Sequence, residues 1–163
     1  MTSLVDLDVA YVATPKNVVR QMLSLAGLRR GETFFDLGAG DGRILIEAVR
    51  GFGARATGIE IDPQRVSRIK ERLRSTGIKA EIVQADLLDV DLSTADVVAL
   101  YLSESVNAKL ATKLQKELKA GSRIISLDYP LPGWVLEKEV TVKGPLARKL
   151  FLYRVSDVKT TKG

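Results

Sequence analysis

A glycine-rich turn directly after a short strand-like segment is the feature that most constrains this fold. Residues 33–35 are followed by Asp36-Leu37-Gly38-Ala39-Gly40-Asp41-Gly42-Arg43. Without Cβ atoms at Gly38 and Gly40, the chain can turn tightly and its backbone can lie against a ligand. The helix expected next offers free N–H donors at its start. The pattern therefore predicts a strand, a turn and a helix around a small nucleotide-like cofactor.

The spacing differs from the dinucleotide-binding fingerprint, in which a third glycine follows three residues after the second. Here that position is Arg43. Asp36 and Asp41 flank the turn, and two carboxylates repel a pyrophosphate but attract a cation. A ligand with an ammonium or sulfonium group therefore fits this turn better than NAD does.

Two more acids follow expected strands. Residues 56–60 end in Glu60, about 20 residues after the turn, where a carboxylate accepts hydrogen bonds from ribose hydroxyls. Residues 80–84 run toward Asp86, which is placed to accept from an exocyclic adenine amine. Carboxyl ends of parallel strands meet at one edge of an open sheet, so we expect these acids to gather there. Taken singly, Glu60 and Asp86 are equally well explained as solvated loop acids or helix caps.

The chain's 163 residues, 45% of them hydrophobic, suffice for one domain with a buried core. We expect residues 15–158 to form this domain, residues 1–14 to form an N-terminal arm or lid, and residues 159–163 to form a frayed tail. No apolar run approaches the ~20 residues that cross a bilayer, and the N-terminus lacks the build of a signal peptide. The expected location is the cytoplasm.

Cysteine and histidine are absent from the chain. Their absence excludes disulfides, thiolate metal sites, a thiol nucleophile and the usual base at neutral pH, and we expect no metal site. Two asparagines, no cysteine and many Lys, Arg and Glu residues favour a heat-loving source.

Alternating helix and strand signals predict an α/β fold. Thr14 is the expected N-cap of the first helix with Pro15 at its first position, and Gly121 is the expected stop of the last helix. Helices are expected at residues 15–26, 44–50, 63–75 and 105–119. Strands are expected at residues 33–35, 56–60, 80–84, 95–100, 122–127, 135–142 and 149–155.

This order of signals resembles the class I methyltransferases that use S-adenosylmethionine, over nearly the whole chain. The resemblance implies a Rossmann-like, doubly wound α/β sheet of seven mostly parallel strands with a C-terminal antiparallel hairpin. It places Asp36 near the methionine ammonium, Gly38 to Gly40 at the close-approach turn, Glu60 at the ribose and Asp86 at the adenine. The implied cofactor contacts are Thr14, Asp36, Leu37, Gly38, Ala39, Gly40, Asp41, Glu60, Ile61, Asp86, Leu87 and Tyr101.

The segment Leu100-Tyr101-Leu102-Ser103-Glu104, after the fourth expected strand, bears on the methyl acceptor. Methyltransferases of planar exocyclic amines or glutamine amides typically show Asp or Asn, Pro-Pro and an aromatic residue here, and this motif is missing. The absence of cysteine also excludes C5 methylation of pyrimidines, which needs a thiol nucleophile. With residues 11–15 and the glycine turn, the segment resembles the archaeal broad-specificity protein lysine methyltransferases. These are relatives of the mitochondrial family that modifies the ATP synthase c subunit.

That narrower resemblance implies direct transfer of methyl from S-adenosylmethionine to lysine ε-amino groups of other proteins, with a broad substrate range. The expected catalytic residues are Tyr101, Tyr11 and Glu104. Tyr101 and Tyr11 line a channel in which desolvation and the sulfonium charge lower the pKa of the lysine. Glu104 attracts the substrate lysine together with Asp128. Tyr129 is either a further lining residue or a core aromatic. We expect a monomer whose partners are proteins with exposed lysines, and no membrane.

The net charge of +5 leaves a nucleic-acid-binding function open. One expected helix carries the candidate basic stretch, which consists of Arg65, Arg68, Lys70, Arg72 and Arg74. These side chains fall on different faces of the helix and no aromatic residue interleaves with them, so a solvated surface is favoured over a phosphate track. The open alternatives are an RNA methyltransferase, a tetrapyrrole methyltransferase and a cofactor-binding module without catalysis.

Overall fold

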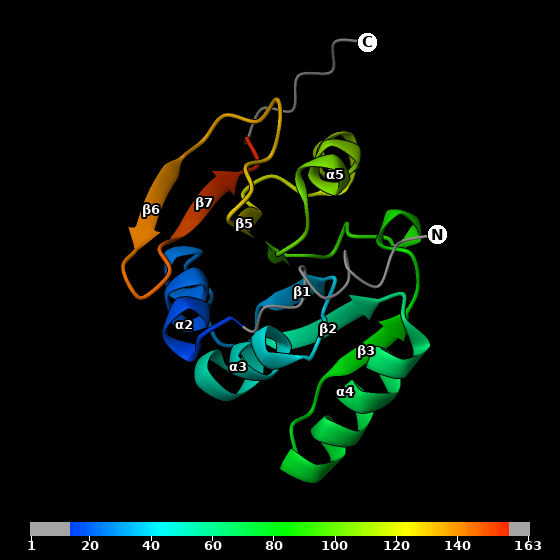
Figure 1. Ribbon diagram of the computed structural model, residues 1–163. Coiled ribbons are helices and arrows are strands. Elements are labelled where there is room, and N and C mark those ends of the chain that lie inside the picture. Colours follow the sequence, from blue (N-terminus) through cyan, green and yellow to red (C-terminus); the bar gives the residue numbers. More distant parts are fainter. Residues whose placement is uncertain (1–13, 157–163) are drawn as a thin grey trace.

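The computed structural model describes residues 14–156, which form one seven-stranded sheet flanked by helices (Figure 1). The strands lie in the order β3-β2-β1-β4-β5-β7-β6, and β7 runs antiparallel to both of its neighbours. They are β1 (Thr33–Leu37), β2 (Arg55–Glu60), β3 (Glu81–Gln84), β4 (Val97–Leu100), β5 (Arg123–Leu127), β6 (Lys138–Val142) and β7 (Arg148–Arg154). The expected mostly parallel sheet with a C-terminal antiparallel hairpin is confirmed.

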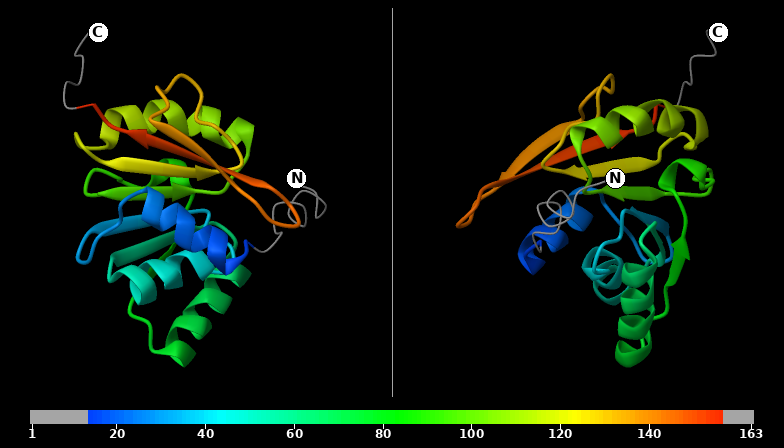
Figure 2. Two further views of the ribbon diagram at one scale, coloured as in Figure 1. Left: turned by 90° about the vertical axis from the view of Figure 1, so that its left-hand side faces the viewer. Right: turned by 45° about the vertical axis from the view of Figure 1, so that its right-hand side comes forward.

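Within the described residues, helices cover both faces of the sheet, as a doubly wound fold requires. Figure 2 shows α5 (Glu104–Glu117) on one side and α2 (Lys16–Leu25), α3 (Arg43–Phe52) and α4 (Pro63–Thr76) on the other. Successive strand side chains point to opposite faces, so Phe34 packs with α2 and α3 whereas Phe35 packs with α5. No helix of this described part combines the length and apolarity that a membrane crossing requires.

Local signals set the ends of α4. Asp62 caps the helix by accepting a hydrogen bond from the Gln64 N–H at 2.9 Å, and Pro63 is its first residue. Gly77 ends it with a φ of +69°. This helix therefore starts where the sequence predicts.

The expected N-cap at Thr14 is wrong. Pro15 is the N-cap of α2, and its extended backbone (φ −58°, ψ 148°) delays the helix until Lys16. Thr14 is buried instead, and its carbonyl accepts a hydrogen bond from Arg43 Nη1 at 2.7 Å. The residue therefore joins α2 to the glycine turn rather than capping a helix.

Two other expected ends also shift. α5 ends at Glu117 rather than at the expected residue 119 before Gly121, because Leu118 is extended and fully buried in the core beneath α5. β6 begins at Lys138, and Val135, which the sequence places in that strand, lies before it and is 88% exposed. Apolar residue type alone therefore gave the wrong start for this strand.

A buried arginine ties the start of β5 to the end of α2. The Arg123 guanidinium donates to the carbonyls of Ala26 and Gly27 at 2.9 Å each and to both carboxylate oxygens of Glu32 at 2.7 and 2.9 Å. Hydrogen bonds from Arg123 lower the pKa of Glu32 more than burial raises it. The guanidinium thus satisfies carbonyls at a helix end that the helix itself leaves unpaired.

We expect Arg123→Met to lower the free energy of unfolding by about 3–5 kcal/mol, because Glu32 and two carbonyls lose their partner. Denaturant unfolding measures this loss. The loss should shrink as the pH falls below 4.5, where the stabilisation from the lowered pKa of Glu32 disappears. The matched control is Arg154→Met on β7, whose ion pair with Glu137 is about half exposed, and we expect it to cost less than about 1 kcal/mol. Equal losses in the two variants would contradict this account of Arg123.

Candidate active site

The glycine turn lies at the carboxyl end of β1 and is bonded to the end of β2. The Gly38 N–H donates to the Ile59 carbonyl at 2.9 Å, and the Gly40 N–H donates to Glu60 Oε1 at 2.9 Å. Gly38 has a φ of +79°, and a Cβ atom there would lie 2.6 Å from Leu102 Cδ2. The backbone conformation therefore favours glycine here, and a Cβ atom would also have to displace the end of the Leu102 side chain.

Asp36 is a buried carboxylate with one unsatisfied oxygen. It is 2% exposed, and among the described residues its Oδ2 has no hydrogen-bond partner. Burial, assisted by the charges of Glu60 and Asp41, raises the pKa of Asp36 to about 7, against a smaller lowering by the Leu45 N–H. A cation beside this oxygen would relieve the cost of a buried charge, so the site fits an ammonium group.

Asp41 is paired with the arginine that follows the turn. Arg43 donates to Asp41 Oδ2 through Nη2 at 2.7 Å and through Nε at 3.0 Å. Burial raises the pKa of Asp41, but the hydrogen bonds from Arg43 outweigh burial and the net pKa is lowered. Since the next arginine along the chain neutralises Asp41, Asp36 is the acid of the turn that remains available to a cation.

Glu60 is the last residue of β2, and Asp86 follows the neighbouring strand β3. Glu60 is 5% exposed, and its Oε2 accepts from the Asp62 N–H at 3.0 Å, so each of its oxygens holds one backbone donor and keeps a second lone pair. Asp86 is exposed, and its Oδ1 accepts from the Leu88 N–H at 2.9 Å at the start of the 3₁₀ helix η1 (Leu87–Asp89). Asp86 therefore caps this helix through its Oδ1.

The other expected cofactor contacts surround these acids. Ile61 directly follows Glu60 and is 64% exposed, so an apolar side chain lies uncovered at the end of β2. Leu87 is half-buried after β3, whereas Leu37 and Ala39 are buried under the turn. The edge thus presents an apolar surface between two carboxylates, which suits a flat heterocycle next to a sugar.

The expected acceptor residues are only partly within the described structure. Tyr101 follows β4, beside the glycine turn because β4 pairs with β1, and burial raises the pKa of its hydroxyl. Glu104 is the first residue of α5 and is exposed, and Ser103 caps that helix. Tyr11 and the rest of the expected N-terminal lid before residue 14 lie outside the described residues.

Two polar residues near this edge were missed by the sequence analysis. Asn107 of α5 is fully buried, and its Nδ2 donates to the carbonyls of residues 129–130 at 3.2 Å. Arg148, the first residue of β7, is 4% exposed, with its guanidinium carbon 5.2 Å from the centre of the Tyr101 ring. A signal existed for Asn107, because it shares a helix face with buried leucines, but the sequence around Arg148 gives none.

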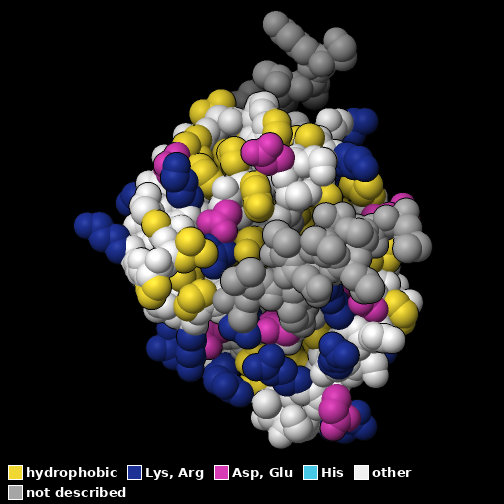
Figure 3. Space-filling view, in the orientation of Figure 1, with side chains coloured by type: hydrophobic (Ala, Val, Ile, Leu, Met, Phe, Trp, Pro, Cys, Tyr) yellow, Lys and Arg dark blue, Asp and Glu magenta, His cyan; other side chains and the backbone are white. Residues whose placement is uncertain are grey.

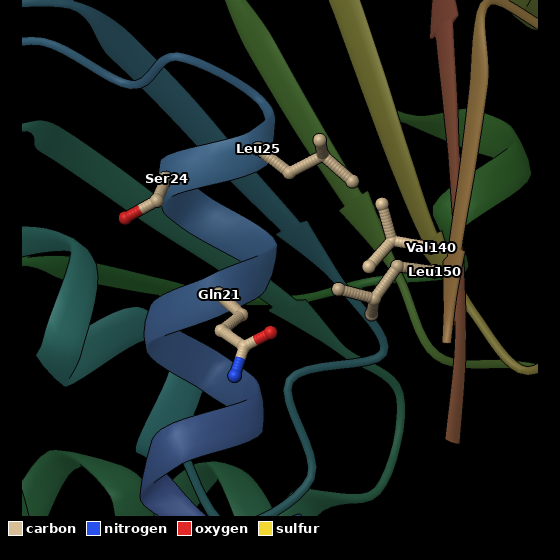
Figure 4. Close-up of a pocket in the computed structure, with 5 residues that line it drawn as sticks. All are labelled: Gln21, Ser24, Leu25, Val140 and Leu150. Atoms are coloured by element: carbon tan, nitrogen blue, oxygen red, sulfur yellow. The ribbon is translucent and has the colours of Figure 1, made fainter. Parts of the chain in front are cut away.

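A shallow recess lies between α2 and the β6–β7 pair (Figure 4). Its volume is about 320 Å³, and its lining consists of Gln21, Ser24, Leu25, Val140 and Leu150. None of these side chains carries a charge. The recess therefore lacks partners for the charged end of a nucleotide-like cofactor, in contrast to the edge at Asp36.

Basic side chains gather over α3 and α4 in Figure 3, with acidic side chains among them. On α4, Arg74 pairs with Glu71, and Arg72 donates to the Asp41 carbonyl at 3.1 Å. The helix contains no aromatic residue. The α4 surface is therefore mixed in charge and carries no aromatic side chain on which a base could stack.

The sequence is similar to known methyltransferases. The ANTKMT methyltransferase domain model matches residues 36–138, from the buried acid of β1 to the start of β6. A protein-lysine N-methyltransferase of Saccharolobus islandicus is 37% identical, across 93% of this chain and 96% of that protein. The adenine nucleotide translocase lysine N-methyltransferase of Mus musculus is 34% identical, across 91% of this chain but only 64% of that protein.

A solved methyltransferase structure also resembles this chain in fold and in sequence. The crystal structure described as an RNA methyltransferase from Salinibacter ruber in complex with S-adenosyl-L-homocysteine superposes with a TM-score of 0.85 and 38% identity, covering 90% of this chain and 95% of that one. The resemblance to lysine methyltransferases that the motifs indicated is confirmed at the level of family. With its fold, its turn and its relatives in agreement, the chain belongs to the family of the ANTKMT methyltransferase domain.

Proposed function

We propose that this protein transfers methyl groups from S-adenosylmethionine to lysine ε-amino groups of other proteins. The observation that carries the proposal is the unpartnered oxygen of the buried Asp36, which fits the ammonium of the cofactor's methionine part. Identity of 37% along nearly the whole length of a protein-lysine N-methyltransferase supports the acceptor class. The cytoplasm as its location, a monomeric state and a heat-loving archaeal source belong to the same proposal.

Residues at the carboxyl ends of β1, β2 and β3 each bind a different part of the cofactor. Asp36 holds the ammonium, Gly38 and Gly40 allow the methionine part to lie against the backbone, and Glu60 uses its free lone pairs for the ribose hydroxyls. Asp86 accepts from the adenine amine through the oxygen that does not cap η1. The exposed Ile61 and the half-buried Leu87 supply apolar contact to the adenine ring.

The acceptor side needs a neutral amine at a fixed position. When bound, S-adenosylmethionine supplies an electrophilic methyl group, which the amine takes up as the C–S bond breaks and S-adenosylhomocysteine is left. Tyr101 lines the approach next to the turn and keeps water away from the amine, which lowers the pKa of the lysine. The exposed Glu104 attracts the charged lysine before it enters.

An RNA acceptor is the second candidate, because the Salinibacter ruber structure is described as an RNA methyltransferase at 38% identity. Against it stand the mixed charge of α4 and the absence of aromatic residues from that helix. The segment after β4 also lacks the Pro-Pro-aromatic motif typical of base amine methylation. The lysine acceptor therefore has the stronger support.

Incubation with radiolabelled S-adenosylmethionine and an unstructured lysine-containing peptide should place label on lysine nitrogens, located by mass spectrometry. The matched control peptide has arginine at each lysine and should stay unlabelled. Transfer RNA is tested in parallel, at low and high salt, because phosphate contacts are salt-dependent. Label on RNA with none on the peptide would contradict the lysine assignment and favour the second candidate.

Asp36→Asn should make the ligand-free protein more stable at neutral and higher pH and weaken its binding of the cofactor. The ordinary pKa of 3.8 is raised to about 7 in the fold, so the ligand-free protein loses up to about 4 kcal/mol of stability as the pH rises from 4 to 7. We expect the variant to lack this loss, to melt at a higher temperature than the unchanged protein at pH 8, and to bind S-adenosylmethionine at least about tenfold more weakly.

The control for this comparison is Glu81→Gln, which removes an exposed acid at the start of β3. It should change neither the cofactor affinity nor the dependence of melting temperature on pH. A lower melting temperature of Asp36→Asn at pH 8, or an unchanged affinity for the cofactor, would show that Asp36 is not the buried site of the ammonium.

The proposed lid is tested by removing residues 1–13. Thr14 is buried and bonded to Arg43, so the described chain starts directly against the cofactor turn. If the preceding residues fold over the cofactor, their removal should weaken S-adenosylmethionine binding by about tenfold and leave the melting temperature of the ligand-free protein nearly unchanged. Calorimetric titration measures the affinity, and an unchanged value would exclude the lid.

A further inference from the structure

A buried guanidinium lies against the face of Tyr101. Arg148 is 4% exposed, and its Cζ is 5.2 Å from the ring centre, which is within the range of a cation–π contact. Its Nε donates to Asp128 Oδ2 at 2.8 Å. Its Nη2 lies 2.7 Å from the same oxygen as an ion pair without hydrogen-bond geometry, and a side-chain hydrogen bond with Tyr101 contributes to the pKa of both groups. The face of the Tyr101 ring is therefore one of the main contacts of the Arg148 guanidinium.

The partner of this guanidinium has a strained backbone. Asp128 has a φ of +67°, and it is the one non-glycine residue of the described chain in the left-handed region. Strand β7 holds it there: the Asp128 N–H donates to the Lys149 carbonyl at 2.7 Å, and the Lys149 N–H donates to Asp128 Oδ1 at 3.1 Å. Two bonds thus fix both the backbone and the carboxylate of Asp128.

Stability alone does not account for this arrangement. Burying an ion pair gains little over apolar packing of the same volume, and a left-handed aspartate costs on the order of 1 kcal/mol. Strained residues of this kind cluster at functional sites. Tyr101, Asp128 and Arg148 all lie at the edge that carries the glycine turn, because β4, β5 and β7 are successive neighbours in the sheet.

The geometry points to Arg148 as a positioning residue for the methyl acceptor: held by Asp128, it fixes the Tyr101 ring as the wall along which the acceptor amine is aligned. The inference rests on the proposed function in one respect, that Tyr101 lines the acceptor approach. Arg148 acts through the ring rather than on the amine. Misplacement of such a wall by about 1 Å can cost up to about 100-fold in rate without any change in cofactor contacts.

A double-mutant cycle tests this role. Arg148→Met should lower kcat by about tenfold, change the affinity for S-adenosylmethionine less than threefold, and be largely rescued in Arg148→Lys, which keeps a cation at the ring. Tyr101→Leu should lower kcat by at least the same factor. If Arg148 acts through the ring, the double variant should be no slower than Tyr101→Leu alone. Multiplicative losses, or no rescue by lysine, would overturn the inference.

Arg154→Met is the matched control, since Arg154 is another β7 arginine in an acid pair. It should leave kcat unchanged. A general destabilisation of β7 would lower kcat in this variant too, and that result would also count against a specific role of Arg148. Circular dichroism and melting temperature are recorded for every variant, and the cycle is measured below the lowest melting temperature.

The failure of this inference is distinguishable from a failure of the proposed function. The cycle uses whichever acceptor the unchanged protein methylates, so label on RNA alone would overturn the lysine assignment but not the cycle. A measurement without activity is the ultraviolet titration of the Tyr101 hydroxyl, taken as the difference from Tyr101→Phe. Burial raises the pKa of Tyr101 and the Arg148 charge lowers it, so Arg148→Met should move the midpoint upward. An unmoved midpoint would show that the guanidinium and the ring are not paired.

Discussion

The bond between the Gly40 N–H and the Glu60 carboxylate holds the carboxyl ends of β1 and β2 together. With the Gly38 N–H on the Ile59 carbonyl, it fixes a turn whose backbone is open to a ligand. The same bond brings the Glu60 charge into the surroundings of Asp36, whose pKa rises to about 7 through burial and through that charge. A fold stabilised in this way carries a buried acid whose charge an incoming ammonium ion would compensate, and this is the basis of the proposed cofactor site.

Much of the fold could be predicted from the sequence because its signals are local. The expected helix start at residue 63 and the expected strand, glycine turn and helix around residues 33–43 depend on residues within a few positions of one another, and the structure has both. The prediction of Thr14 as the N-cap is wrong because Pro15, whose backbone is extended, takes that position itself. The predicted start of β6 is wrong because pairing with β7, and not the apolar side chain of Val135, decides where that strand begins.

The candidate site was predictable only where its residues follow strands. Asp36 and Glu60 lie at the ends of β1 and β2 and Asp86 lies just after β3, and parallel strands bring their ends to one edge whatever the remaining packing is. Arg43 and Arg148 could not be found this way, because their roles depend on which acid each one meets in space. The fold also does not decide the acceptor. Relatives with 37% and 38% identity carry a lysine and an RNA description, so overall identity does not decide the acceptor either.

The most direct test of the central claim is the number of protons released when S-adenosylmethionine binds at pH 6. Calorimetric titration in two buffers of different ionisation enthalpy gives this number. With a pKa of about 7, Asp36 is about nine tenths protonated at pH 6 in the ligand-free protein, and the ammonium should displace that proton, so a release close to one is expected, falling markedly by pH 7.5. Binding without proton release at pH 6 would contradict the claim that a protonated, buried Asp36 receives the cofactor.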